Sequence, residues 1–158
     1  MTATAESQIK HAFWTQLSAS PFVMLELDDA PHSAAPMTAQ LDKDAHGAIW
    51  FFTSRDGAFA RMGAATATFV AKDHTLFARF TGRLTEEKKR ELLDKFWTEP
   101  VAAWFPEGKH SRQVLLLRME LGAASIWDAR MGVLAVTRML LGMNVRDELR
   151  GHHVNTSL

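Results

Sequence analysis

The chain of 158 residues is 47% apolar and 23% charged, which is an ordinary globular composition and enough to bury one core. Eighteen basic residues balance eighteen acidic ones, so no bulk charge draws the protein to nucleic acid or to an anionic membrane. The lack of cysteine excludes disulfides, thiolate chemistry and cysteine-ligated metal sites. Redox chemistry would therefore require a bound cofactor.

The organisation of the chain indicates a single domain over residues 1–158. Residues 1–7 lack the basic stretch and apolar run of a secretion signal, and no segment approaches the roughly 20 apolar residues of a membrane span. No internal repeat, low-complexity tract or linker divides the chain. We therefore expect a cytoplasmic protein without a membrane partner, in which residues 1–7 and 143–158 form flexible tails.

The first half of the chain predicts one helix followed by four strands. Apolar residues recur at helical spacing over residues 6–18, and Pro21 prevents the helix from continuing. Short apolar or alternating runs predict strands at residues 22–27, 36–41, 48–53 and 65–70. The turn residues at 42–47 favour a hairpin between the second and third strands, and residues 58–62 can form a short helix.

The second half predicts a fifth strand, further helices and one long final strand. In residues 75–82, Leu76, Ala78 and Phe80 share one face, and the preceding turn favours pairing with the fourth strand. A capping pattern at 85–88 predicts a helix that runs to residue 97, and a short helix and a loop follow over residues 100–108. A strand begins at residue 114 and can extend through 127. The last predicted element is a helix over residues 130–141, which Gly142 ends.

The order of these elements favours a mainly β protein with flanking helices (α+β). Consecutive strands are joined by short turns, as antiparallel neighbours are. A small barrel would leave few exposed sheet edges, but a sandwich fits the same residue pattern. The pattern alone therefore leaves barrel and sandwich open.

Three motifs in a fixed order point to a known family. They are Pro-Met-Thr at residues 36–38, Trp-Phe-Phe-Thr-Ser at 50–54 and Trp-Phe-Pro-Glu-Gly-Lys at 104–109, with further agreement at 65–72 and 82–84. Over about residues 8–128 the chain resembles the general stress protein branch of the pyridoxamine 5′-phosphate oxidase-like superfamily. The resemblance implies a six-stranded antiparallel split β-barrel of the FMN-binding type, in which a homodimer holds two FMN molecules in clefts at its interface.

The resemblance also implies which residues bind the flavin, either FMN or FAD. The implied residues are Met37, Thr38, Ala39, Phe52, Thr53, Ser54, Arg55, Lys72 and Trp104. The backbone of residues 37–39 would run beside the isoalloxazine ring. Residues 52–54 would lie by the ribityl chain and the phosphate, where hydroxyls and turn amides can bind phosphate oxygens. Trp104 would stack on the flavin from the partner subunit, although a core role for this tryptophan fits the sequence equally well.

The segment that is expected to bind the flavin phosphate departs from the family pattern. Residues 57–59 read Gly-Ala-Phe where related oxidases carry a serine followed by basic residues, so Phe59 stands where a phosphate lysine is usual. Arg55 is the nearest charge, and Arg61 and Lys72 are further substitutes, although each is equally typical of a solvated surface cation. We expect either weaker flavin binding or a different bound form.

The sequence predicts no catalytic residue and no metal site. His74 lies in a turn without a paired carboxylate, residues 152–153 are two histidines without further ligands, and the acids at 86–87 suit the first turn of a helix. Any redox chemistry would then belong to the flavin, and the protein would supply position and electrostatics.

Three functions follow from this reasoning. The leading hypothesis is a flavin-binding general stress protein, with oxidoreductase activity on a small molecule as its potential chemistry. The second is oxidation of pyridoxamine 5′-phosphate, which the missing basic residues and the lack of a C-terminal arginine segment disfavour. The third is a flavin-free split-barrel dimer that serves as a binding or regulatory module, which the departure at 57–59 keeps open.

Overall fold

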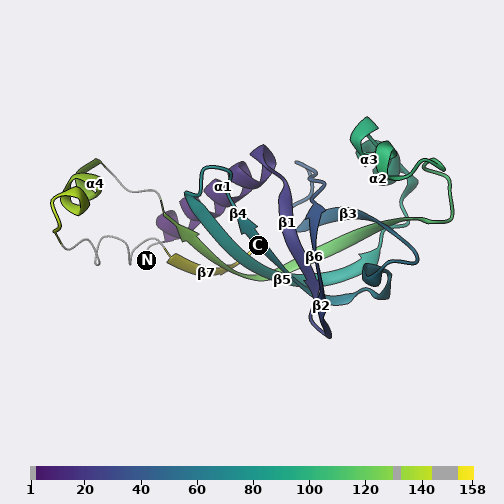
Figure 1. Ribbon diagram of the computed structural model, residues 1–158, viewed down its shortest axis with the longest axis horizontal. Helices are drawn as coiled ribbons and strands as arrows, with labels where there is room; N and C mark the ends of the chain where they lie inside the picture. The colour runs from purple at the N-terminus through teal and green to yellow at the C-terminus, as the bar shows by residue number, and fades with distance from the viewer. Residues whose placement is uncertain (1–2, 130–132, 144–152) are drawn as a thin grey trace.

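Helices flank one antiparallel sheet in the computed structural model of the protein, which describes residues 3–129, 133–143 and 153–158 (Figure 1). The elements are α1 (Ala3–Ala19), β1 (Phe22–Leu27), β2 (Ala30–Thr38), β3 (Ala48–Ser54), the 3-10 helix η1 (Ala58–Arg61), β4 (Gly63–Val70), β5 (Leu76–Glu86), α2 (Arg90–Phe96), α3 (Glu99–Trp104), β6 (Val114–Asp128), α4 (Val133–Leu140) and β7 (His153–Ser157).

The seven strands of the described chain form one sheet in the order β2-β1-β4-β5-β6-β3, and β7 pairs with β6. Long antiparallel ladders join β4 to β5 and β5 to β6. Between the two end strands, β2 and β3, the described structure has one isolated bridge, which joins Gln40, two residues after β2, to Trp50 of β3. The sheet is therefore a barrel that stays open between β2 and β3, and we call this opening the split.

The interior of the barrel is filled by side chains from the sheet and from α1. Alternation along β5 buries Leu76, Ala78 and Phe80 on one face. Helix α1 adds Phe13, whose ring packs edge-on against Phe69 at 6.0 Å and against Phe80 at 5.5 Å. Complete burial of side chains of this size contributes about 1.5–3 kcal/mol each, so this aromatic group contributes several kcal/mol to the stability of the fold.

A smaller apolar cluster lies outside the barrel, between β3, β6 and α2. Trp50 and Leu116 from the strands pack with Phe96 of α2, and the Trp50 and Phe96 ring centroids are 5.2 Å apart. The Trp50 indole N–H donates to Glu87 Oε1 at 3.0 Å, which satisfies its buried polar atom. This cluster holds α2, and α3 after it, beside β3 (Figure 1).

Most of the predicted architecture is confirmed. The fold is mainly antiparallel β with flanking helices, the fourth and fifth predicted strands pair, and residues 114–128 form a single long strand. A short helix follows β3, as η1. The described chain has seven strands instead of the predicted six because its C-terminal end adds β7.

Two predictions in the middle of the chain are wrong. Residues 85–86 do not start a helix, because β5 continues in register with β6 as far as Glu86 and α2 begins only at Arg90. The hairpin between residues 36–41 and 48–53 does not form apart from the single bridge, because β2 pairs with β1 and β3 pairs with β6. In both cases long-range strand pairing replaces a locally favoured structure.

Regular secondary structure extends into both of the predicted tails. Helix α1 already begins at Ala3, and β7 runs antiparallel to β6, with His153 opposite Trp127 and their rings stacked at 4.7 Å. The prediction of a frayed polar end is therefore wrong for residues 153–157. Residues 1–2 and 144–152 of the predicted tails lie outside the described residues. A short polar strand carries little hydrophobic signal, because its partner supplies the backbone hydrogen bonds.

The predicted last helix is present as α4, with residues 130–132 of the prediction outside the described residues. Gly142 has φ +70°, and the Met143 N–H donates to the Arg138 carbonyl at 2.9 Å, which is a left-handed glycine cap. The glycine thus ends the helix as predicted. None of the described helices is long and apolar enough to cross a membrane.

Candidate functional site

A pocket lies in the split, where β2 and β3 diverge. At the bridge, Gln40 N–H donates to the Trp50 carbonyl at 2.7 Å and Trp50 N–H returns a bond of 3.0 Å. Continuing this register would place Thr38 opposite Phe52 and Pro36 opposite Ser54, but the ladder stops at the bridge. Proline has no N–H to donate, which disfavours further pairing at that position. The strands therefore separate and leave space between them.

The pocket has a volume of about 350 Å³, within the usual range for small-molecule sites. The residues that line it are Pro36, Met37, Thr38, Phe52, Thr53, Ser54, Val101, Trp104 and Phe105. The first six come from the two strand ends, and the last three come from α3 and the residue after it. These lining residues carry three hydroxyl groups and no charge, so they suit an aromatic or apolar ligand with neutral polar groups.

The backbone of β2 offers one amide to this space. Ala39 is 3% exposed and its N–H donates to the Pro21 carbonyl at 2.7 Å, on the β1 side. Because hydrogen-bonding direction alternates along a strand, Met37 also turns its N–H to β1, whereas Thr38 turns its N–H toward the split. Of the three amides predicted beside the ring, the structure thus favours that of Thr38, and Ala39 does not line the pocket.

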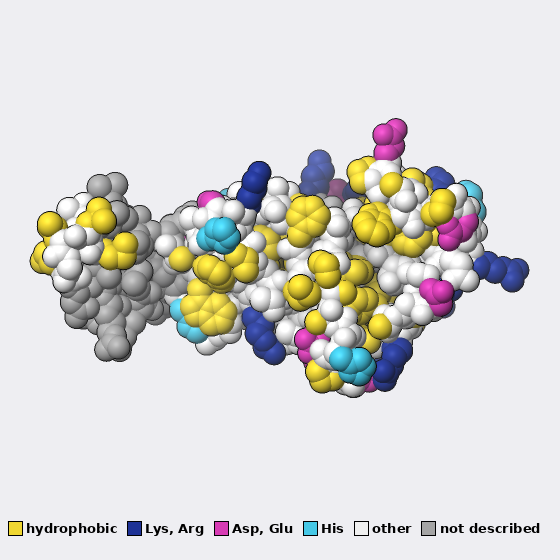
Figure 2. Space-filling model, viewed as in Figure 1, with side chains coloured by type: hydrophobic (Ala, Val, Ile, Leu, Met, Phe, Trp, Pro, Cys, Tyr) yellow, Lys and Arg dark blue, Asp and Glu magenta, His cyan; other side chains and the backbone are white. Residues whose placement is uncertain are grey.

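An aromatic wall borders the pocket on the side of α2 and α3. The Phe52 ring lies 5.6 Å from Trp97 and 6.4 Å from Phe105, and the last two are 6.0 Å apart. Trp104 lines the pocket with a side chain that is 83% exposed. Figure 2 shows hydrophobic side chains gathered around these two helices, at the upper right. A flat exposed tryptophan of this kind can stack on a planar ligand.

Two carboxylates, one in the turn after β3 and one at the end of β5, bind Ser54 of the pocket lining and the residue that follows it. Ser54 Oγ–H donates to Asp56 Oδ1 at 2.5 Å, and the Arg55 guanidinium donates to Glu86 Oε1 at 2.5 Å. The Gly57 N–H closes the turn on the Ser54 carbonyl. The hydrogen bond from Arg55 holds the pKa of the Glu86 carboxyl below its ordinary value of 4.5, so Glu86 stays ionised.

The predicted cationic residues lie outside the pocket lining. Arg55 is bound to Glu86, and Arg61 pairs with Asp29 at 3.1 Å on the surface. Lys72 is exposed in the turn between β4 and β5. Phe59 is 5% exposed and packs into the main core, so that position does not face the pocket. The residues that line the pocket therefore include no cation.

The structure adds lining residues that the sequence prediction did not assign to the site. Pro36 and Phe105 belong to the motifs at 36–38 and 104–109, and Val101 lies one helical turn before Trp104. The i, i+3 spacing of Val101 and Trp104 on a short helix is the signal that could have identified this residue. Val101 therefore adds an apolar side chain to the pocket lining and no polar contact.

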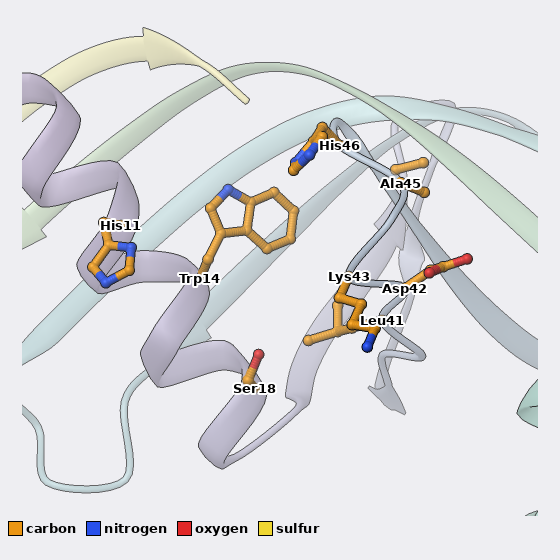
Figure 3. A pocket seen from close by; sticks show the side chains of 9 residues that line it. His11, Trp14, Ser18, Leu41, Asp42, Lys43, Ala45 and His46 are labelled. Carbon is orange, nitrogen blue, oxygen red and sulfur yellow. The ribbon is translucent and has the colours of Figure 1, made fainter.

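A second pocket lies between α1 and the loop that precedes β3 (Figure 3). It measures about 390 Å³, and the Trp14 ring projects into it toward His46. Its one carboxylate, Asp42, is bound by Lys95 at 2.9 Å, and this hydrogen bond lowers the pKa of Asp42. The sequence prediction did not identify this pocket. The described residues contain no cluster of three or more potential metal-ligating side chains here or elsewhere.

Comparison with known proteins shows the family of the chain. The family model described as pyridoxamine 5′-phosphate oxidase like matches residues 8–148. The chain belongs to this family. No curated protein matches the chain.

Solved structures place the chain in the general stress protein branch. A Jannaschia sp. CCS1 protein named for general stress protein 26 is 26% identical with a TM-score of 0.78, and the match covers 96% of this chain and 99% of that one. The general stress FMN/FAD binding protein of Xanthomonas citri is 36% identical with a TM-score of 0.71, covering 80% and 93%. A general stress family protein of Xanthomonas campestris pv. campestris is 34% identical with a TM-score of 0.67, covering 80% and 92%.

Proposed function

We propose that the pocket in the split binds a flavin, FMN or FAD, and that the protein uses it for oxidoreductase chemistry on a small molecule. The observation that carries this proposal is the meeting of residues 36–38 and 52–54 with Trp104 around one uncharged, aromatic pocket. The flavin binding of the Xanthomonas citri relative supports it. A bound flavin would supply hydride or electron transfer, and the protein would supply position and exclude water.

The lining residues suit the isoalloxazine ring and the ribityl chain. The Thr38 N–H, on the unpaired edge of β2, can donate to a polar edge of the ring. The hydroxyls of Thr53 and Ser54 can bind the ribityl hydroxyls, and Trp104 can stack on the ring. The phosphate fits this chain less well, because the lining residues include no cation.

Flavin fluorescence during titration with FMN and riboflavin tests the proposal, and we expect a dissociation constant in the micromolar range. Trp104→Ala should weaken binding of both flavins by about fivefold to tenfold, because a stacking surface is lost. Trp14→Ala is the matched control in the second pocket and should leave both affinities unchanged. Equal losses in the two variants would place the flavin elsewhere, and no binding by the natural chain would favour the flavin-free module.

We propose further that the protein works as a homodimer with flavin sites at the interface. An exposed apolar row crosses the outer face of the sheet, since Val70 is paired with Phe77 and Phe77 with Trp127, and these side chains are 42%, 39% and 42% exposed. Phe22 and Met24 extend it on β1. Contiguous exposed apolar surface of this kind is typical of protein interfaces.

Light scattering coupled to size exclusion, run over a dilution series, tests the dimer. The natural chain should remain dimeric, and Phe77→Asp should dissociate it because a charge would enter the apolar row. Gln8→Asp adds the same charge on an exposed part of α1 and should leave the dimer intact. A flavin-bound monomer of the natural chain would show that the flavin site is complete within one chain, and the proposed site at the dimer interface would be wrong.

A further inference from the structure

Carboxylates of the chain itself already bind Ser54, which is the last β3 residue of the pocket lining, and Arg55, which follows it. Ser54 donates its hydroxyl to Asp56, and Arg55 donates its guanidinium to Glu86, each at 2.5 Å. The pocket lining beside them carries no charge. A phosphate bound beside Ser54 would therefore approach two anions, and the described pocket lining offers it no cation.

Glu86 and a phosphate would compete for the same partner. A guanidinium binds carboxylate and phosphate oxygens through the same charge-assisted hydrogen bonds. Glu86 lies at the end of β5, where its backbone is fixed by pairing with Leu117 of β6, so this carboxylate is held in place beside Arg55. The guanidinium of Arg55 has further N–H donors, but its charge is already shared with Glu86, and a phosphate that binds beside it would be repelled by that carboxylate.

We propose that Glu86 sets how strongly this pocket distinguishes FMN from riboflavin: by pairing with Arg55, it reduces the gain in affinity that the phosphate of FMN would bring. This inference rests on the proposed flavin site. Riboflavin requires only neutral partners, which Thr38, Thr53 and Ser54 supply. FMN adds a phosphate, and Arg55, the cation next to Ser54 in the chain, is already paired with Glu86.

The exposure of the pair sets the size of the effect. The Arg55 side chain is 46% exposed and that of Glu86 is 27% exposed, so solvent screens the interaction. The competition should therefore change FMN binding by severalfold and not abolish it. Asp56, bound to Ser54, should add a smaller effect of the same sign.

Glu86→Gln removes the competing charge while keeping the shape of the side chain. We expect FMN affinity to rise by about threefold to tenfold, because Arg55 becomes available and one repulsive charge disappears. Riboflavin affinity should change by less than about twofold. Dissociation constants for both flavins come from fluorescence titration, and thermal denaturation confirms that the variant is folded.

Glu120→Gln is a matched control. Glu120 also pairs with an arginine, Arg118, at 2.8 Å, but it lies opposite Ala48 at the far end of the β3–β6 ladder. The same substitution there should leave the ratio of FMN to riboflavin affinity unchanged. A general effect of net charge would instead raise FMN affinity in both variants, which would overturn the role of Glu86.

A double-mutant cycle with Arg55→Gln tests whether Arg55 is the cation that Glu86→Gln makes available to the phosphate. Arg55→Gln should cancel most of the gain that Glu86→Gln produces, because the cation is then missing. If flavins bind but Glu86→Gln leaves the FMN-to-riboflavin ratio unchanged, the inference is wrong and the flavin site stands. If neither flavin binds to any variant, the proposed function itself fails and the inference falls with it.

Discussion

Aromatic residues lie both in the split and in the part of the barrel formed by β4, β5 and β6, which we call the closed wall, but their roles in the two regions differ. In the closed wall, β4, β5 and β6 are joined by long ladders, and the Phe69 and Phe80 rings are at most 1% exposed. In the split, β2 and β3 are joined by one bridge, and Trp104 is 83% exposed. Aromatic side chains therefore stabilise the fold in one region and leave a binding surface in the other.

This difference separates stability from binding within one small domain. A ladder that satisfies every backbone group leaves none for a ligand, whereas an unpaired strand edge offers donors and acceptors at the cost of stability. Substitutions in the closed wall should therefore change the free energy of unfolding, and substitutions in the split should change flavin affinity. Four predictions test this separation, in order of expected effect on stability.

Phe80→Ala should have the largest effect. The Phe80 ring is fully buried and packs against Phe13 of α1 at 5.5 Å, so its removal leaves a cavity under the helix. We expect a loss of about 3–5 kcal/mol in the free energy of unfolding, measured by urea denaturation. Flavin affinity of the folded fraction should remain unchanged. A loss below 1 kcal/mol would show that the closed wall does not carry the stability.

Gly82→Ala should be the next most damaging change. Gly82 follows an irregularity in the β5–β6 register, and an added Cβ would lie 2.4 Å from the Glu120 carbonyl oxygen and 2.9 Å from Met119 Cγ. The ladder would have to shift, which should cost about 1–3 kcal/mol. Gly108→Ala offers a comparison, since open space surrounds its Cβ position, although its φ of +90° adds backbone strain. Urea denaturation of both variants separates the steric clash from that strain.

The Arg55–Glu86 pair should give a small, pH-dependent effect. Arg55 lowers the pKa of Glu86 in the folded protein, so the stabilisation is present above the ordinary value of 4.5 and is lost as the pH falls through the lower folded pKa. Because both side chains are partly exposed, we expect less than about 1 kcal/mol. The stability difference between the natural chain and Glu86→Gln should therefore be larger at pH 7 than at pH 3, and the opposite trend would contradict the pairing.

Trp104→Ala should change stability least. Its exposed side chain contributes little to the core, so the free energy of unfolding should stay within about 0.5 kcal/mol of the natural value in the absence of flavin. A larger loss in thermal or urea denaturation would mean that Trp104 supports the fold, and the contrast between the two regions would fail at this residue.

The sequence by itself determined the local features of this protein. Period-two alternation predicted the buried face of β5 at Leu76, Ala78 and Phe80, because each side of a strand meets one environment. Gly142 predicted the end of α4, because few other residues adopt the left-handed cap. The family motifs at 36–38, 50–54 and 104–109 named most of the residues that line the pocket.

The tertiary structure decided what depends on contacts between distant segments. The local turn at 42–47 favoured a hairpin, but pairing of β2 with β1 and of β3 with β6 opened the split instead. Pairing also turned Ala39 away from the pocket and left Thr38 facing it. Arg55 and Glu86 are separated by 31 positions in the chain, and only the folded sheet brings them together. Strand partners and charge partners are chosen by the whole fold, so no local pattern could reveal them.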